Sequence, residues 1–155
     1  MSSLNGVREK ISLFGGLTER EVSVVLPYLE LTGFEKGECV FEQGALPTSV
    51  FIVLNGEVQL QTIKSNGGKA HVNFLPGDCF GESSVIGIQP QMGSAVAIKN
   101  TTVLELKSES LMVLAEADKE IFSVLMMNIA REVSRRLHSF FTCPDDCQEL
   151  PVQRA

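Results

Sequence analysis

The chain has 155 residues, of which 44% are apolar and 21% are charged, and its formal net charge is −6 at pH 7. This composition predicts one soluble globular domain with a buried core and excludes a chain that is disordered throughout. The acidic balance argues against a direct nucleic-acid surface, because phosphate contacts require clustered lysine and arginine. No apolar run approaches the ~18 residues of a membrane span, and the first residues lack the apolar region of a signal peptide. We therefore expect a cytoplasmic protein with no membrane partner.

Two helices are expected at the start of the chain. Apolar residues at roughly helical spacing predict the first over residues 4–15. Thr18 and Glu21 have the spacing of a capping box, which predicts that a second helix begins here. We expect this helix to run to about Leu29, with a distortion at Pro27.

Short runs rich in β-branched and aromatic residues then follow one another between glycine turns, which is typical of strands. Asn55-Gly56 and Ser65 to Gly68 are hairpin signals. The runs over residues 57–63 and 69–75 alternate polar and apolar side chains, as half-buried strands do. Strands at this regular spacing predict a mainly β fold, either a sandwich or a jelly roll.

Helical spacing returns after residue 107. Ser108 or Ser110 is expected to cap a helix that ends near Ala117, and Asp118 to cap a second helix over residues 119–141. That second helix has an apolar stripe consisting of Phe122, Leu125, Met126, Ile129, Val133, Leu137 and Phe140. Three arginines lie near its end: Arg131, Arg135 and Arg136. Since they complement the helix dipole there, we expect solvated side chains in preference to a phosphate site.

The four cysteines fall into two pairs. Cys39 and Cys79 stand in apolar, strand-like surroundings and are expected to be small core residues. Cys143 and Cys147 lie in a polar tail, where two loose thiols, a disulfide or redox pair and a weak zinc site are the alternatives. The chain thus divides into N-terminal helices over 1–31, a β-roll over 32–107, C-terminal helices over 108–141 and a flexible tail over 142–155.

One stretch carries residues suited to a ligand. Phe80 is followed by a glycine, a carboxylate and two hydroxyls: Gly81, Glu82, Ser83 and Ser84. Glycine lets the backbone approach a ligand, and a short helix opening here would present unpaired N–H groups to a phosphate. A carboxylate beside a phosphate is understandable if the ligand also offers a hydroxyl. The alternative is that Glu82 is simply a first-turn carboxylate favoured by the helix dipole.

Residues 80–97 resemble the phosphate-binding cassette of the cyclic nucleotide-binding domain family, which includes the catabolite activator protein and the regulatory subunit of protein kinase A. Phe80-Gly81-Glu82 matches the family pattern fully, and Pro90 also fits. The family arginine that pairs with the cyclic phosphate is missing, because Gln91 stands at its place and no arginine occurs between Arg20 and Arg131. The resemblance covers about residues 10–140 and implies a jelly-roll β-roll with flanking helices.

The resemblance also implies the site. Its expected ligand-binding residues are Phe80, Gly81, Glu82, Ser83, Ser84, Gln91 and Ser94. The ligand would be cAMP or cGMP, bound weakly, and the 119–141 helix would serve as a ligand lid, a dimer seam or a docking surface for a protein partner. The alternative is a degenerate domain that binds no nucleotide and acts in dimerisation or docking.

An enzyme is not expected. A jelly roll could be a metal-dependent cupin, but His71 and His138 have no ligand spacing to each other, and His71 is expected on a strand surface. No nucleophile and base stand together, so we expect no catalytic residue, metal or cofactor. The resemblance to the catabolite activator protein would imply a DNA-binding helix-turn-helix after the long helix. About 14 residues follow Phe141, which are too few for such a unit, so we do not expect direct DNA binding by this chain.

Overall fold

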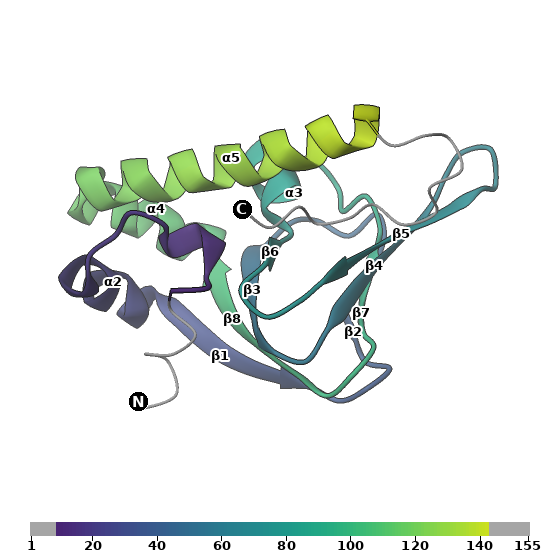
Figure 1. Cartoon of the computed structure of the whole chain (residues 1–155), viewed down its shortest axis with the longest axis horizontal. Helices are drawn as coiled ribbons and strands as arrows, with labels where there is room; N and C mark the ends of the chain where they lie inside the picture. Colours follow the sequence, from purple (N-terminus) through teal and green to yellow (C-terminus); the bar gives the residue numbers. More distant parts are fainter. Residues whose placement is uncertain (1–8, 143–155) are drawn as a thin grey trace.

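The computed structural model describes residues 9–142, which form two four-stranded antiparallel sheets with helices beside them (Figure 1). The strands are β1 (Leu29–Phe34), β2 (Cys39–Phe41), β3 (Ser49–Asn55), β4 (Val58–Ile63), β5 (Lys69–Phe74), β6 (Cys79–Phe80), β7 (Ser94–Ala97) and β8 (Thr101–Lys107). One sheet has the order β1-β8-β3-β6 and the other the order β2-β7-β4-β5. The predicted mainly β fold, a jelly roll with flanking helices, is confirmed.

The helices are η1 (Ser12–Phe14), α2 (Glu19–Val25), η2 (Leu26–Tyr28), α3 (Glu82–Gly87), α4 (Ser108–Ala117) and α5 (Lys119–Thr142). In Figure 1 α5 runs along one side of the molecule, with α3 between it and the strands. Asp118 caps α5 as predicted, because its carboxylate accepts from the Ile121 N–H at 3.0 Å. The predicted serine cap of α4 is wrong: Lys107 precedes this helix, and no side chain caps it. None of the helices within residues 9–142 is long and apolar enough to cross a membrane.

The N-terminal segment differs from the prediction. Only residues 9–15 of the expected first helix are described, and they contain the single 3₁₀ turn η1. The capping box at Thr18 is confirmed, but α2 ends at Val25, well before Leu29. The chain passes through a 3₁₀ turn that contains Pro27, and Leu29 already pairs with Leu106 on β8. A proline without an N–H and the pairing with β8 together end the helix early.

The buried apolar residues form two clusters on opposite sides of the β1-β8-β3-β6 sheet. Val50 and Ile52 of β3 belong to the cluster that also contains residues of η1, α2, α4 and α5. Phe51 and Val53 belong to the cluster between the two sheets. Because successive side chains of a strand point to opposite faces, β3 is buried on both sides. This explains why its sequence is a continuous apolar run instead of an alternating one.

The predicted hairpin at Asn55-Gly56 is wrong, although the turn exists. The Asn55 side chain accepts from the Gly56 N–H at 2.8 Å, and Gly56 has a φ of 88°. The flanking strands β3 and β4, however, lie in different sheets. The turn at Ser65 to Gly68 does join a pair, since β4 and β5 are antiparallel neighbours from Val58↔Phe74 to Ile63↔Lys69. A local turn signal fixes the reversal of the chain without fixing the strand's partner.

The predictions for Cys79 and Cys39 have different outcomes. Cys79 is fully buried, as expected, and burial raises the pKa of its thiol to about 12. The prediction that Cys39 is a core residue is wrong, because this side chain is exposed and its sulfur contacts the Phe41 carbonyl at 3.1 Å. Cys143 and Cys147, together with the predicted tail, lie outside the described residues.

Asn128 fastens α5 to the N-terminal segment. Its side-chain amide donates to the carbonyls of Leu13 and Gly15, both at 2.8 Å, and the residue is buried. We expect Asn128→Ala to lower the free energy of unfolding by about 2 kcal/mol, because two carbonyls lose their donor inside the protein. Urea unfolding measures this, with the exposed neighbour Met127→Ala as a control that should change stability by less than about 0.5 kcal/mol. Equal stability of the two variants would show that the amide bonds contribute nothing.

Candidate functional site

A cavity of about 280 Å³ lies between the β-roll, α3 and the C-terminal half of α5. Its wall is mostly apolar. The residues that line it are Phe41, Leu60, Val72, Phe74, Phe80, Gly81, Glu82, Ser83, Ser84, Gln91, Met92, Val133, Arg136, Leu137 and Phe140. The strands thus supply one side, the stretch after β6 supplies the polar groups, and α5 covers the cavity. Few polar groups in an apolar hollow are typical of a small-molecule site.

The backbone turns sharply at Gly81, immediately before α3. Gly81 has a φ of 80°, a left-handed conformation that a residue with a Cβ rarely adopts. A Cβ there would also lie 3.0 Å from the Ser49 carbonyl oxygen and 3.3 Å from the Phe51 ring. Glycine therefore lets the chain leave β6, pass close to β3 and turn Glu82 inward.

Glu82 and Arg136 form an ion pair in the wall of the cavity. The Glu82 side chain is 1% exposed and that of Arg136 is 25% exposed. One Nη of Arg136 donates to Glu82 Oε1, and the other donates to the Cys79 carbonyl. The guanidinium carbon also lies 5.0 Å from the centre of the Phe74 ring, a cation–π contact. One arginine of α5 thereby joins the long helix to β5, β6 and α3.

The pair leaves hydrogen-bonding capacity unused. Glu82 Oε2 and Arg136 Nε are both buried, and neither has a hydrogen-bond partner. An unpaired buried polar atom costs roughly 1–3 kcal/mol relative to a satisfied one. The site therefore holds an acceptor and a donor that a bound molecule could satisfy.

The electrostatics of the pair are set by burial. Burial raises the pKa of the Glu82 carboxyl, and the Arg136 guanidinium offsets this only in part. Burial also works against the charge of Arg136 and is the largest single influence on it, but the neighbouring acidic groups, Glu82 first among them, together outweigh burial and raise the pKa of Arg136. Arg136 thus remains charged, and Glu82 depends on it for a counter-charge. Loss of either partner would leave the other as a costly buried group.

The structure brings most of the predicted site residues together. Phe80, Gly81, Glu82, Ser83, Ser84 and Gln91 all line the cavity. Gln91 is buried, and its backbone bonds to Ala45 and Gly44 at 2.9 and 2.8 Å. Ser94 lies elsewhere: its hydroxyl accepts from the Gln43 N–H at 2.9 Å, and it lines a separate hollow.

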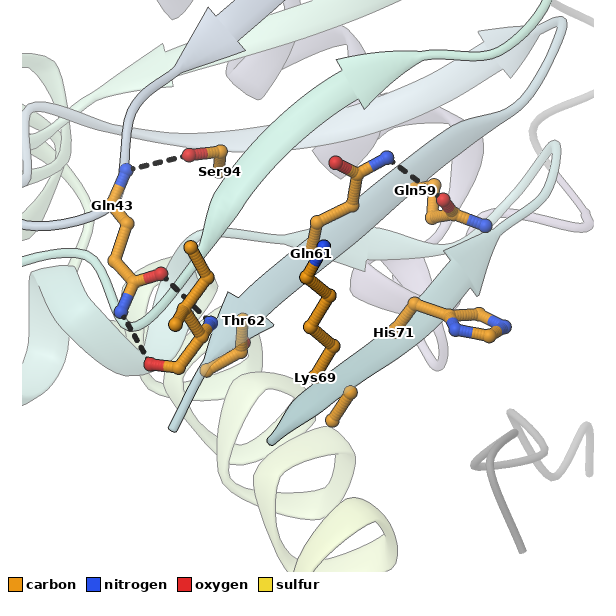
Figure 2. Close-up of a pocket in the computed structure, with 9 residues that line it drawn as sticks. Gln43, Gln59, Gln61, Thr62, Lys69, His71 and Ser94 are labelled. Atoms are coloured by element: carbon orange, nitrogen blue, oxygen red, sulfur yellow. Dashed lines mark hydrogen bonds between the residues drawn. The ribbon is translucent and has the colours of Figure 1, made fainter. Parts of the chain in front are cut away.

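That second hollow, of about 300 Å³, lies over the ends of β4 and β5 (Figure 2). The Gln43 side chain bonds twice to the backbone of Ile63, with both distances at 3.0 Å. Gln61 donates to Gln59, which donates to Asn73, each at 2.9 Å. Since these amides are engaged with one another and with the backbone, they serve to join the strands.

Arg136 is the site residue that sequence reasoning missed, and the expectation that it is solvated is wrong. Its position on α5 could have indicated that it is buried. Val133, Leu137 and Phe140 line the cavity, and Arg136 interrupts their apolar stripe on the same face of the helix. A charge within an apolar stripe implies a buried partner. That partner, Glu82, is 54 residues away in the chain.

Comparison with known proteins identifies this architecture. The family model described as cyclic nucleotide-binding domain matches residues 31–118. The chain belongs to the cyclic nucleotide-binding domain family. The matched segment runs from within β1 to the end of α4, and therefore includes strands of both sheets and α3.

Other members of the cyclic nucleotide-binding domain family share sequence and fold with this chain. The cyclic AMP receptor protein of Thermus thermophilus is 31% identical over 126 residues, which cover 81% of this chain and 56% of that protein. The crystal structure of the Thermus thermophilus catabolite activator protein has a TM-score of 0.75 at 29% identity, covering 84% of this chain and 60% of the other. The chain thus spans somewhat more than half the length of these relatives.

A third similar structure is a variant of the regulatory subunit of a cAMP-independent protein kinase A from Trypanosoma brucei. It is 18% identical with a TM-score of 0.75, and the match covers 90% of this chain and 49% of that one. The variant carries three substitutions, one of them threonine to arginine, and is bound to cAMP. At this identity the similarity concerns the fold.

Proposed function

We propose that this chain is a regulatory domain that binds cAMP, cGMP or a related ligand weakly and signals through α5. The observation that carries the proposal is the placement of Glu82. This carboxylate lies in the wall of an apolar cavity, has one oxygen without a partner, and is held by an arginine of the long C-terminal helix. A carboxylate so placed suits a ligand that combines an apolar base with a sugar hydroxyl.

The cavity offers a partner for each part of such a ligand. The apolar side chains of the strands and of α5 would contact the base, and Glu82 Oε2 would accept from the ribose 2′-hydroxyl. Ser83 and Ser84 add hydroxyl groups to the same wall. The volume of about 280 Å³ is close to the lower limit of ordinary small-molecule sites, about 300 Å³.

Binding at Glu82 would reach α5 directly. Arg136 of α5 and the carboxylate of Glu82 are hydrogen-bonded, so a ligand that bonds to Glu82 changes the environment of a residue on the helix. If two positions of α5 differ in this contact, the ligand shifts their populations by its differential affinity. The partner that reads the position of α5 would be a second copy of the chain or another protein, docked on residues 119–141.

Weak affinity is expected because Gln91 stands where the family pattern has arginine. A charge-assisted hydrogen bond contributes roughly 1.5–3 kcal/mol, which is about 10- to 100-fold in affinity. We therefore expect calorimetric titration with cAMP and cGMP to give dissociation constants of about tens to hundreds of micromolar. Gln91→Arg should tighten binding by about tenfold or more, because Gln91 already lines the cavity.

Gln89→Arg is the matched control for this experiment. It adds the same charge two residues away, but Gln89 is exposed and does not line the cavity, so affinity should change less than about threefold. Binding that tightens equally in both variants would indicate a general charge effect. If neither the wild type nor Gln91→Arg binds at about millimolar ligand, the nucleotide function is wrong.

The second candidate function is a domain that binds no nucleotide and acts in dimerisation or protein docking. The exposed apolar side chains at the end of α5 favour it, because Leu137, Phe140 and Phe141 are 57%, 59% and 75% exposed. A wild type that stays silent while Gln91→Arg binds would support this function. The cavity would then be intact but would lack the cassette arginine that pairs with the cyclic phosphate.

A further inference from the structure

The chemistry of a 3′,5′-cyclic nucleotide places two requirements side by side. Its 2′-hydroxyl and its phosphate are carried by neighbouring carbons of one ribose ring. A site that binds both must therefore place an acceptor and a cation within a few ångströms of each other. Glu82 and Arg136 meet this requirement, because their side chains are in hydrogen-bond contact.

Arg136 also supplies the positive charge in the wall of the cavity. Among the described residues that line the cavity, it is the one lysine or arginine. Gln91 lines the same cavity but can donate only neutral hydrogen bonds. An anion that enters this apolar hollow would therefore find its counter-charge on α5.

The guanidinium has donors to spare. Arginine carries five N–H bonds. The structure engages one Nη with Glu82 and the other with the Cys79 carbonyl, and Glu132 Oε2 also lies 3.8 Å from this second Nη. Its Nε has no partner at all. Because Nε and Glu82 Oε2 are both buried, a ligand can reach them only if the contact between α3 and α5 adjusts.

We infer that Arg136 is the phosphate ligand of this site and takes the place of the missing cassette arginine. The inference rests on the proposed function. On binding, the Arg136–Glu82 bond is exchanged: the guanidinium bonds to the cyclic phosphate, and the carboxylate bonds to the ribose hydroxyl. A cassette arginine would hold the phosphate within the β-roll, whereas Arg136 holds it from the helix that carries the signal.

The test is calorimetric titration of cAMP into the wild type and Arg136→Met, with Arg135→Met as the matched control. Arg135 is one residue away and does not line the cavity. It bonds at 2.9 Å to Glu132, a carboxylate that also lies 3.8 Å from Arg136. We expect Arg136→Met to weaken binding by about 10- to 100-fold and Arg135→Met by less than about threefold. Arg136→Lys, which keeps the charge but loses the fork, should fall between.

The Arg136→Met variant leaves Glu82 buried without a counter-charge, which destabilises the fold. A second comparison therefore uses variants that lack the Glu82 carboxylate. Glu82→Gln and Glu82→Gln/Arg136→Met both lack that carboxylate, and Arg136 should still contribute about tenfold to affinity between them. Gln91→Arg should also tighten binding more in the Arg136→Met background than in the wild type. Two cations on one phosphate are not additive, and the double-mutant cycle measures this coupling.

The outcomes separate this inference from the proposed function. If the wild type binds cAMP and Arg136→Met binds as tightly or more tightly, the domain is a sensor but Arg136 does not hold the phosphate. Equal losses in Arg136→Met and Arg135→Met would likewise overturn the inference, since a general charge effect would explain both. Silence of the wild type and of Gln91→Arg would remove the proposed function and the inference with it.

Discussion

Arg136→Met is expected to lower the free energy of unfolding by about 3 kcal/mol near neutral pH. The substitution leaves Glu82 buried without its counter-charge, and breaking one side of a buried ion pair costs roughly 3–5 kcal/mol. We use the lower figure because the Arg136 side chain is 25% exposed. The substitution also removes the donor to the Cys79 carbonyl and the contact with Phe74. Urea unfolding followed by circular dichroism measures the loss.

The size of this loss should depend on pH. Burial already raises the pKa of Glu82, and without Arg136 nothing offsets it as strongly. A carboxyl with a higher pKa in the folded protein holds its proton more tightly there than in the unfolded chain. The variant therefore keeps its stability below the unfolded pKa of about 4.3 and loses it as pH rises through the folded pKa. The difference from the wild type should be smaller near about pH 4, where only the lost contacts with Cys79 and Phe74 contribute, than near about pH 8.

Glu82→Gln/Arg136→Met is the control for this interpretation. Without the Glu82 carboxyl group this pH dependence should disappear, and the double variant should recover much of the loss because Glu82 is no longer left without its counter-charge, while Glu132 keeps its bond to Arg135. Equal losses for Arg136→Met at both ends of this pH range would contradict a role for the Glu82 charge. The lost contacts of the arginine would then explain the destabilisation.

Phe80→Ala should destabilise the protein by about 3–5 kcal/mol. The Phe80 side chain is 1% exposed, and its ring is stacked on Phe51 and Phe74 at centroid distances of 5.1 and 5.2 Å. Truncation opens a cavity between the two sheets and removes both aromatic contacts. For a chain of this size the melting temperature should fall by about 10 to 15 °C, as measured by calorimetry.

Phe141→Ala is the matched control because Phe141 is 75% exposed. Its melting temperature should lie within about 2 °C of the wild type. A loss of less than about 1 kcal/mol in Phe80→Ala would mean that neighbouring side chains move to fill the space. The cavity beside α5, which Phe80 also lines, would then be expected to shrink.

Local patterns predicted much of the fold because they depend on neighbours in the chain. The capping box at Thr18, the cap at Asp118 and the alternation of β4 and β5 each involve residues a few positions apart. Partner choice was not predictable in this way. Asn55-Gly56 has the chemistry of a hairpin turn, yet β3 pairs with β6 and β8 because its two faces are buried in different clusters.

In the site, too, residues that are adjacent in sequence were predictable, and contacts between distant segments were not. The stretch from Phe80 to Ser84 could be predicted as part of it because glycine, carboxylate and hydroxyls are adjacent in sequence. Arg136 could not, since its relation to Glu82 depends on how α5 lies across the β-roll. The dipole argument applied to a solvated helix end, but desolvation and a buried carboxylate dominate here. The departure of Ser94 from the cavity likewise follows from its bond to Gln43.

The amide of Asn128 also fixes where α5 can turn. Its two bonds to the N-terminal segment hold the helix about 1.4 turns before Val133, the first residue of α5 that lines the cavity, so the first half of the helix stays with the core. From Asn128 to Thr142 the helix is about 21 Å long at 1.5 Å per residue. A tilt of about 10° about this fulcrum would move the far end by about 4 Å. Arg136 lies about 12 Å from Asn128 along the helix and Phe140 about 18 Å, so a displacement of α5 beside Arg136 would be about 1.5 times larger at Phe140.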